Sequence, residues 1–125
     1  MPKASKETAS KVEEMGVMEG RYEELGGYTV GFEMFREDAD AAPLMKGLPD
    51  DRCQSPHWGY VVSGRVTFSY ADREEVCEAG NAYYAEPGHI PAVIAGTEVI
   101  EFSPTNDYER TLEVIGKNMA AMQNA

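Results

Sequence analysis

The stretch Cys53-Gln-Ser-Pro-His57-Trp-Gly-Tyr-Val-Val-Ser-Gly64 decides the fold class of this chain. Trp, Tyr and Val favour strands, and the Ser-Gly pair that follows them favours a tight turn. The same alternation of apolar run and turn continues along the chain, with apolar runs at 58–62, 65–70, 74–77, 82–85, 90–94 and 98–102. Short strands with closely spaced turns, and no helices between them, predict an all-β fold of two antiparallel sheets, a barrel or sandwich.

The sequence before this stretch predicts two more strands and a long loop. Residues 22–25 and 28–35 are rich in strand-favouring residues, and Gly26-Gly27 between them supplies a turn. Residues 36–52 contain two prolines and many acidic residues, with one helical turn expected near Ala41. A loop of this length in a small domain is usually a lid or cover for a functional site.

Residues 1–16 form a polar extension, and the sequence leaves its structure open. Lys and Glu recur along it in a way that fits a short helix from Thr8 to Met15 and fits a frayed tail equally well. We therefore divide the chain into a polar N-terminal extension (1–16), a barrel (17–104) and a C-terminal helix (105–125).

The C-terminal helix is predicted from a capping signal and an apolar stripe. Ser103-Pro104-Thr105 is typical of a helix start, because Ser or Thr caps the first turn and Pro is tolerated there. Apolar residues then recur at spacings of four and three, at Tyr108, Leu112, Ile115, Met119 and Met122. Such a stripe must be buried on the barrel or against a partner subunit, and together with the exposed edges of a small barrel it predicts a homodimer.

Composition and charge limit the classes of function. The chain has 125 residues, enough for one domain with its own core, and a net charge of −11. This charge argues against binding to nucleic acid or to an anionic membrane, because both need clustered Lys and Arg. No apolar run approaches the roughly 20 residues that span a bilayer. The N-terminus is polar and lacks the apolar segment of a signal peptide, so we expect a cytoplasmic protein.

The two cysteines are expected to remain free thiols. A reducing cytoplasm disfavours a disulfide between Cys53 and Cys77, and a domain of this size does not need one. Cys77 lies within a strand-like run before a glycine turn, and we interpret it as a small buried residue of that strand.

Cys53 and both histidines of the chain are candidate metal ligands. Side chains at alternate positions of a strand share a face, so Asp51, Cys53, Ser55 and His57 point the same way if this segment is extended. Gln54 and Trp58 then point the other way. His89 follows the Pro87-Gly88 turn and could lie opposite His57 on a neighbouring strand. Imidazole and thiolate are the ligands that hold borderline metals.

Two segments resemble the motifs of the cupin superfamily, the small double-sheet jelly-roll barrels. His57-Trp-Gly-Tyr60-Val61-Val62-Ser63-Gly64 is similar to the end of the first cupin motif. Gly80-x-x-Tyr83-Tyr84-x-x-Pro87-Gly88-His89 is similar to the second, and Glu101-Phe102-Ser103-Pro104 is typical of the end of the last barrel strand. The resemblance covers roughly residues 25–104 and implies a small single-domain cupin of the cupin-2 type.

The metal-ligand positions of the two motifs differ from the usual pattern. The first motif carries His-x-His and, a few residues later, Glu; the matching positions here are Asp51, Cys53 and His57. The last His of the second motif falls on Pro91 or Ala92, and neither residue can bind a metal. The conventional site of histidines and a glutamate is therefore absent.

A substituted site remains, formed by Cys53, His57 and His89, with Asp51 or Glu101 as a further candidate ligand. The soft thiolate shifts the preference toward Zn²⁺ over Fe²⁺ or Mn²⁺. Each of these residues also has a purely structural interpretation. A strand histidine is often only hydrogen-bonded, and a free cysteine often packs as a small apolar residue.

The resemblance implies two functions and does not decide between an enzyme and a binding protein. The first is a metal-binding cupin that acts on a small molecule, with Tyr84 and Glu101 as candidate acid–base groups. The second is a non-catalytic cupin, binding or structural, whose metal site has decayed. A third hypothesis is a regulatory protein that binds a partner through the stripe of the C-terminal helix.

Overall fold

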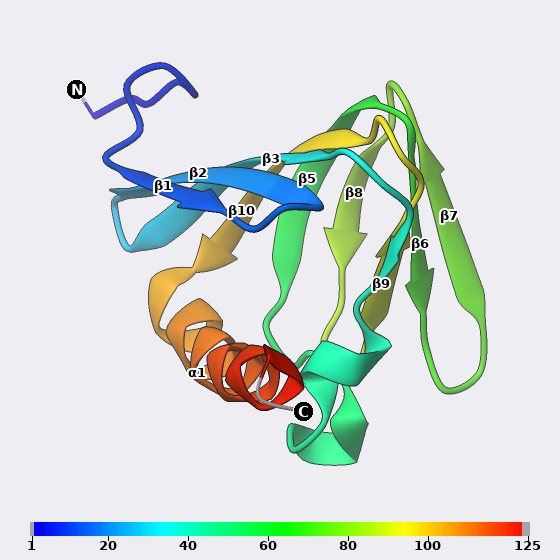
Figure 1. Ribbon diagram of the computed structural model, residues 1–125. Coiled ribbons are helices and arrows are strands. Elements are labelled where there is room, and N and C mark those ends of the chain that lie inside the picture. The colour runs from blue at the N-terminus through cyan, green and yellow to red at the C-terminus, as the bar shows by residue number, and fades with distance from the viewer. Residues whose placement is uncertain (1, 124–125) are drawn as a thin grey trace.

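A computed structural model describes residues 2–123 of the chain, which form two antiparallel β-sheets and a C-terminal helix (Figure 1). The first sheet has the strand order β1-β2-β3-β10-β5-β8 and the second the order β4-β9-β6-β7. The strands of the first sheet are β1 (Lys11–Glu14), β2 (Met18–Leu25), β3 (Tyr28–Phe35), β10 (Glu98–Pro104), β5 (His57–Ser63) and β8 (Ala82–Ala85). Those of the second are β4 (Ala39–Asp40), β9 (Ile90–Val93), β6 (Arg65–Ser69) and β7 (Glu74–Glu78). The predicted all-β double-sheet fold with a C-terminal helix is confirmed.

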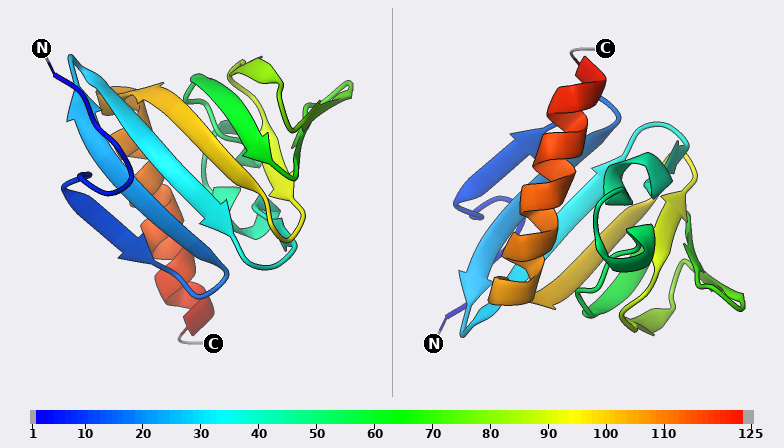
Figure 2. Two further views of the ribbon diagram at one scale, coloured as in Figure 1. Left: turned by 90° about the horizontal axis from the view of Figure 1, so that it is seen from above. Right: turned by 90° about the horizontal axis from the view of Figure 1, so that it is seen from below.

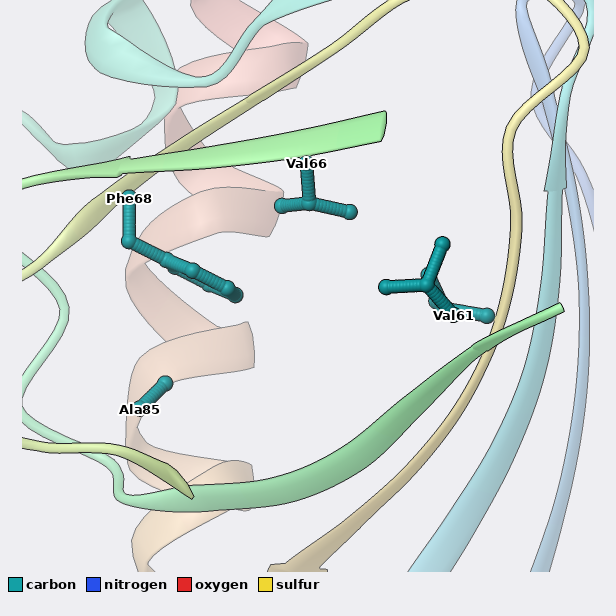
Figure 3. Packing of buried hydrophobic residues seen from close by; sticks show 5 residues of the cluster. Val61, Val66, Phe68 and Ala85 are labelled. Carbon is teal, nitrogen blue, oxygen red and sulfur yellow. The ribbon is translucent and has the colours of Figure 1, made fainter. Parts of the chain in front are cut away.

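The hydrophobic core lies between the two sheets. Val61 of β5 and Ala85 of β8 extend from the first sheet toward Val66 and Phe68 of β6 (Figure 3), and Val99 of β10 belongs to the same cluster. Each of these five side chains is at most 3% exposed. Burial of apolar surface between the sheets therefore holds β5, β8 and β10 against β6.

Glycine turns join the strands where the sequence predicts them. Gly26 and Gly27, which link β2 to β3, both have positive φ angles, of +58° and +86°, as a two-residue hairpin turn requires. Gly64, which links β5 to β6, also has a positive φ, of +79°. These turns set the register in which each strand pairs with the next.

The N-terminal extension contains a strand, which neither of the two expected structures included. Residues Lys11–Glu14 form β1 and pair antiparallel with β2, Lys11 opposite Tyr22 and Glu14 opposite Glu19. Gly16, with a positive φ of +71°, helps to turn the chain back into β2. Because β2 would otherwise leave its backbone groups unpaired, pairing at this edge outweighs the helical propensity of the segment.

The predicted long loop contains short elements that lie beside the C-terminal helix. It forms β4 and two 3₁₀ turns, η1 (Ala42–Met45) and η2 (Pro49–Asp51). The helical turn expected near Ala41 thus begins one residue later. The Asn118 side chain of the helix donates hydrogen bonds to the carbonyls of Leu44 and Lys46, both at 2.7 Å. These contacts join the loop to the helix at one end of the barrel.

The C-terminal helix, α1 (Thr105–Gln123), begins directly after β10 and crosses the first sheet (Figure 2). The last two residues of the predicted helix, 124–125, lie outside the described residues. Thr111 is only 4% exposed, whereas Leu112 and Met122 of the predicted stripe are 37% and 56% exposed. The stripe is therefore only partly covered. Within residues 2–123, no helix is both long and apolar enough to cross a bilayer.

Candidate metal centre

The three candidate ligands Cys53, His57 and His89 lie together inside the barrel. Their ligand atoms are all within 4.8 Å of one another. The side chains are buried, with exposed fractions of 2%, 6% and 0% for the three residues in that order. The spacing in sequence predicted this group, although Cys53 and His89 are separated by 36 positions. We refer to these three residues as the Cys/His triad.

Two backbone features bring the triad together. His57 is the first residue of β5, and Cys53 forms an isolated antiparallel bridge with His89 just before β9. The Cys53 N–H donates to the His89 carbonyl at 2.9 Å, and the Gly88 N–H donates to the Cys53 carbonyl at 2.8 Å. Gly88 has a φ of +97°, so the Pro87-Gly88 turn aims His89 at Cys53.

The strand alternation predicted for residues 53–58 is present, but it does not extend back to Asp51. Cys53 and His57 are buried, and Trp58 is exposed. Asp51 is exposed in the η2 turn with a φ of +55°, and its carboxylate accepts the Gly47 N–H at 2.9 Å. Since a turn rather than a strand precedes Cys53, Asp51 does not reach the triad.

Hydrogen bonds at Nδ1 orient both imidazoles. Nδ1 of His89 donates to the Glu86 carbonyl at 2.6 Å, because a carbonyl can only accept. Its Nε2 atom therefore carries a lone pair. Nδ1 of His57 lies 2.6 Å from Ser103 Oγ and 3.5 Å from Glu101 Oε1. When Nδ1 of His57 carries the ring proton, its Nε2 atom has a free lone pair on the side that faces Cys53. Metal-binding histidines are oriented by this kind of bond at the other ring nitrogen.

The donor atoms fit a borderline divalent metal. Cys53 Sγ and His57 Nε2 are 3.6 Å apart. Zinc bonds of about 2.3 Å to sulfur and about 2.0 Å to nitrogen, at a tetrahedral angle, put these two atoms roughly 3.5 Å apart. His89 Nε2 is buried without a hydrogen-bond partner, the one such side-chain nitrogen or oxygen among the described residues. Leaving a buried polar atom unpaired costs about 1–3 kcal/mol, and a metal ion would remove that cost.

Burial sets the protonation of the triad. It lowers the pKa of His57 to about 4 and, together with the neighbouring His57, lowers the pKa of His89 to about 4 as well. Both imidazoles are therefore neutral at neutral pH, which is the form that binds metals. Burial raises the pKa of the Cys53 thiol to about 11, so this ligand must lose its proton as a metal binds.

A cluster of acids and tyrosines lies beside the triad. Glu33 of β3 and Glu101 of β10 point into the barrel, and the carboxylate of Glu101 approaches His57. Tyr22 donates a hydrogen bond to Glu33 at 2.7 Å, and Tyr83 donates one to Glu101. Burial raises the pKa of both carboxyls to about 7, and repulsion from Glu101 adds to the effect on Glu33.

Of the two candidate acid–base residues, the structure places Glu101 at the site and Tyr84 outside the barrel. Tyr84 is 51% exposed and stacks on Trp58, with ring centroids 5.0 Å apart. Neighbouring strand residues face opposite ways, so Tyr83 is the tyrosine that points inward. Gly59 in the sequence was an indication that Tyr83 is the inward-facing tyrosine. A Cβ on Gly59, which lies opposite Tyr83, would overlap the Tyr83 ring.

Helix α1 covers the triad and borders a groove. Thr111 lies against Cys53, and the Tyr108 ring centroid is 6.4 Å from that of His57. Beside them a groove of about 530 Å³ runs between α1 and the strands β1 and β2, with Leu112, Ile115 and Met119 along its helical wall. Tyr108 also borders the inward-facing acids, so it lies between the groove and the site.

The raised pKa of Glu33 predicts a pH-dependent gain in stability for Glu33→Gln. The folded protein keeps this proton to about pH 7, whereas the unfolded chain releases it near the ordinary value of 4.5. Wild-type stability therefore decreases as the pH rises from 4.5 through 7, and an amide removes that cost. In metal-free protein we expect Glu33→Gln to be more stable than wild type by roughly 1–3 kcal/mol at pH 8.5 and nearly equal at pH 4.5.

Urea unfolding at the two pH values measures this difference. Glu37→Gln is the control, because Glu37 is an exposed glutamate outside the barrel. A Glu33→Gln advantage of the same size at both pH values would show that packing, and not ionisation, is responsible.

Comparison with known proteins identifies the fold through structure alone. No protein-family model matches the sequence, and no curated protein matches it. A protein of unknown function from Rhizobium leguminosarum bv. viciae 3841 superposes with a TM-score of 0.59 at 16% identity, over 82% of this chain and 95% of that one. An RmlC-like cupin from Shewanella frigidimarina superposes with a TM-score of 0.54 at 16% identity, over 81% and 88%.

A third similar structure is KdgF from a Halomonas species, with a TM-score of 0.51 at 16% identity, over 75% of this chain and 87% of that one. Identities this low carry no information about substrate or reaction. They do show a common fold, in agreement with the motifs at residues 57–64 and 80–89.

Proposed function

We propose that this chain, which has the fold of a small cupin domain, binds a divalent metal through Cys53, His57 and His89 and presents it to a small organic molecule. One observation carries the proposal. Three buried donor atoms of metal-binding type lie within 4.8 Å of one another, and one of them, His89 Nε2, has no hydrogen-bond partner. A purely structural cluster would be expected to satisfy that nitrogen.

The donor set favours Zn²⁺. One thiolate and two imidazoles suit a borderline metal better than the harder ions that prefer carboxylate and water. Three protein ligands leave one position open, where a bound metal would polarise a substrate oxygen or activate water. Glu101 Oε1 lies 3.5 Å from Nδ1 of His57, the ring nitrogen that faces away from Cys53, so Glu101 is placed to orient the His57 ring and not to act as a fourth ligand.

Glu101 and Tyr83 are the groups of this chain best placed to hold a proton near the metal. They hydrogen-bond to each other, and burial raises the pKa of Glu101 to about 7. A carboxyl that titrates near neutral pH can both accept and release a proton, as a general acid–base group must. Glu101 therefore keeps the role expected from the sequence, and Tyr83 replaces Tyr84.

The groove beside α1 is the proposed binding site for the organic molecule. Its volume of about 530 Å³ lies within the usual range of small-molecule sites. Leu112, Ile115 and Met119 offer an apolar wall, and Tyr22 and Tyr108 lie between the groove and the acids beside the triad. A ligand with an apolar body and a polar end directed at these tyrosines fits this surface.

A non-catalytic cupin with a decayed metal site is the second candidate. It is favoured by Pro91 and Ala92, which occupy the usual histidine positions of the second motif and pair with β6 as ordinary strand residues. In this case the chain would bind or stabilise a partner molecule without a metal.

Metal analysis of the purified protein separates the two candidates. We expect close to one metal ion per chain in wild type and in Cys77→Ser, whose thiol lies away from the triad. Co²⁺ added to metal-free protein should produce a thiolate-to-metal absorption band that Cys53→Ser lacks. Because the Cys53 thiol must lose a proton, metal affinity should increase about tenfold per pH unit from pH 6 to 8. Wild-type protein that neither contains nor binds metal would support the decayed site.

A further inference from the structure

The groove beside α1 is anionic at the end where the helix begins. Glu24 lines the groove and lies opposite Thr29 in the hairpin of β2 and β3. The Thr29 hydroxyl is 3.0 Å from the hydroxyl of Thr105, the first residue of α1. Glu109, which also lines the groove, follows Thr105 by one turn on the same helical face. The hairpin and the helix start therefore bring two carboxylates to one end of the groove.

The helical wall beyond this end is apolar. Leu112, Ile115 and Met119 line it, and Met15 borders the groove from the segment between β1 and β2. From Glu109 to Met119 the helix rises about 15 Å, which is close to the length of an extended dodecyl chain. The apolar stripe predicted for the helix thus forms one wall of a groove that is apolar over most of its length.

The charged residues around the groove are mostly acidic. They comprise one lysine and four glutamates: Lys11, Glu13, Glu23, Glu24 and Glu109. Lys11 pairs with Glu13, with Nζ 3.3 Å from Oε1. Glu23 accepts hydrogen bonds from the N–H and the hydroxyl of Ser10, at 3.1 and 3.0 Å. Two carboxylates have neither an ion pair nor a side-chain hydrogen bond within residues 2–123, namely those of Glu24 and Glu109.

We propose that this groove binds a cationic amphiphile, a molecule with an ammonium head and an apolar tail. The inference rests on the proposed function, in which the groove holds the organic ligand, and it assigns the charge of the ligand's polar end. The head pairs with Glu24 and Glu109, and the tail lies along the apolar wall of α1. Tyr22 and Tyr108, with ring centroids 6.2 Å apart, add aromatic surface of the kind that attracts an ammonium.

The balance of charge disfavours an anionic head. The start of α1 carries a partial charge of about +0.5 from the helix macrodipole, which by itself would attract an anion. The two carboxylates without partners outweigh this half charge. Two more acids, Glu33 and Glu101, lie on the inner side of Tyr108. The net charge of the chain, −11, acts in the same direction.

Calorimetric titration with dodecylamine, which is protonated at neutral pH, tests the proposal below the concentration at which the amine forms micelles. We expect saturable binding of one molecule per chain. Dodecanoate has the same chain length and a carboxylate head, and it should bind at least about tenfold more weakly. Butylamine has the same head and a short tail, and it should bind at least about 100-fold more weakly, because it buries far less apolar surface.

Charge-neutralising variants locate the head. Glu24→Gln and Glu109→Gln should each lower the affinity for dodecylamine about threefold to fivefold, and the double variant about tenfold or more. Glu113→Gln is the matched control, because it removes the same charge from an exposed position of the same helix that does not line the groove. It should bind dodecylamine as wild type does. General attraction of a cation to an acidic chain would instead weaken binding equally in all three single variants, and that result would overturn the proposal.

Elemental analysis of the same samples separates this proposal from that of the metal site. Protein that contains metal but does not bind dodecylamine would overturn the cationic ligand and leave the metal site standing. Protein that binds dodecylamine at the two glutamates but binds no metal would do the reverse. Tighter binding of dodecanoate than of dodecylamine would keep the groove as a ligand site and would overturn the assigned charge.

Discussion

Replacing His89 with Ala is expected to remove nearly all the metal from the purified protein and to lower its metal affinity at least about 100-fold. This variant keeps only two donors of the triad, Cys53 and His57. Two protein ligands are too few to bind a borderline divalent ion tightly. His57→Ala should have an effect of similar size. Competition with a chelator of known affinity measures the loss, and elemental analysis measures the metal content.

Cys53→Ser should act differently from the two histidine variants. A hydroxyl is a poor, protonated substitute for a soft thiolate, so Zn²⁺ affinity should fall more than the affinity for harder ions. Cys77→Ser is the matched control, since Cys77 is a partly buried thiol on β7 away from the triad. If metal content is the same in wild type, His57→Ala and His89→Ala, the triad is not the metal site, although the fold would be unaffected.

Gly64→Ala should destabilise the protein by about 3 kcal/mol or more. Gly64 has a φ of +79°, which an L side chain adopts at a cost, and its added Cβ would lie 2.5 Å from the Thr97 Cα. Thr97 cannot move away easily. It is fully buried, and its hydroxyl bonds to both the N–H and the carbonyl of Arg65, at 3.0 and 3.1 Å. Displacement would therefore disturb β6 and the start of β10 together.

Gly80→Ala separates the two causes of this loss. Gly80 has a similar φ of +92°, but nothing lies within 4 Å of a Cβ added there. Gly80→Ala should therefore destabilise the protein only by the cost of an L side chain at positive φ, roughly 1–2 kcal/mol. Urea unfolding of both variants in the same buffer gives the difference, which measures the overlap with Thr97. Equal losses in the two variants would mean that the turn at Gly64 relaxes and that Thr97 is no obstacle.

Much of the site could be predicted because strand geometry is local. The alternation of residues 53–57 predicted that Cys53 and His57 share a face, and the Pro87-Gly88 turn pointed to His89 as the third member. The prediction failed for two further candidate residues, Tyr84 and Asp51. Tyr84 was one residue away from the inward position that Tyr83 occupies, and Asp51 lies in a turn that ends the alternation.

Glu33 was missed for a different reason. Nothing near it in the sequence marks it as functional, and its strand is read as apolar from Tyr28 to Phe35. Only the pairing of β3 with β10 brings Glu33 close to Glu101, 68 residues later in the chain. Gly31 offered an indirect sign, since a Cβ there would lie 2.9 Å from the Tyr22 ring. A glycine inside a strand often marks the close approach of a bulky side chain.

The sequence by itself determined most of the barrel strands, the turns between them, the C-terminal helix and many of the residues that share a face, but not the strands β1 and β4. These features depend on backbone preferences and side-chain alternation over a few residues. Only the tertiary structure decided which face is inside. The period of a strand is the same whichever way it faces, and this sheet turns Glu33 and Glu101 inward while Trp58 and Tyr60 face outward. The packing of β6 and α1 over one face decided this, and that packing depends on residues far apart in the chain.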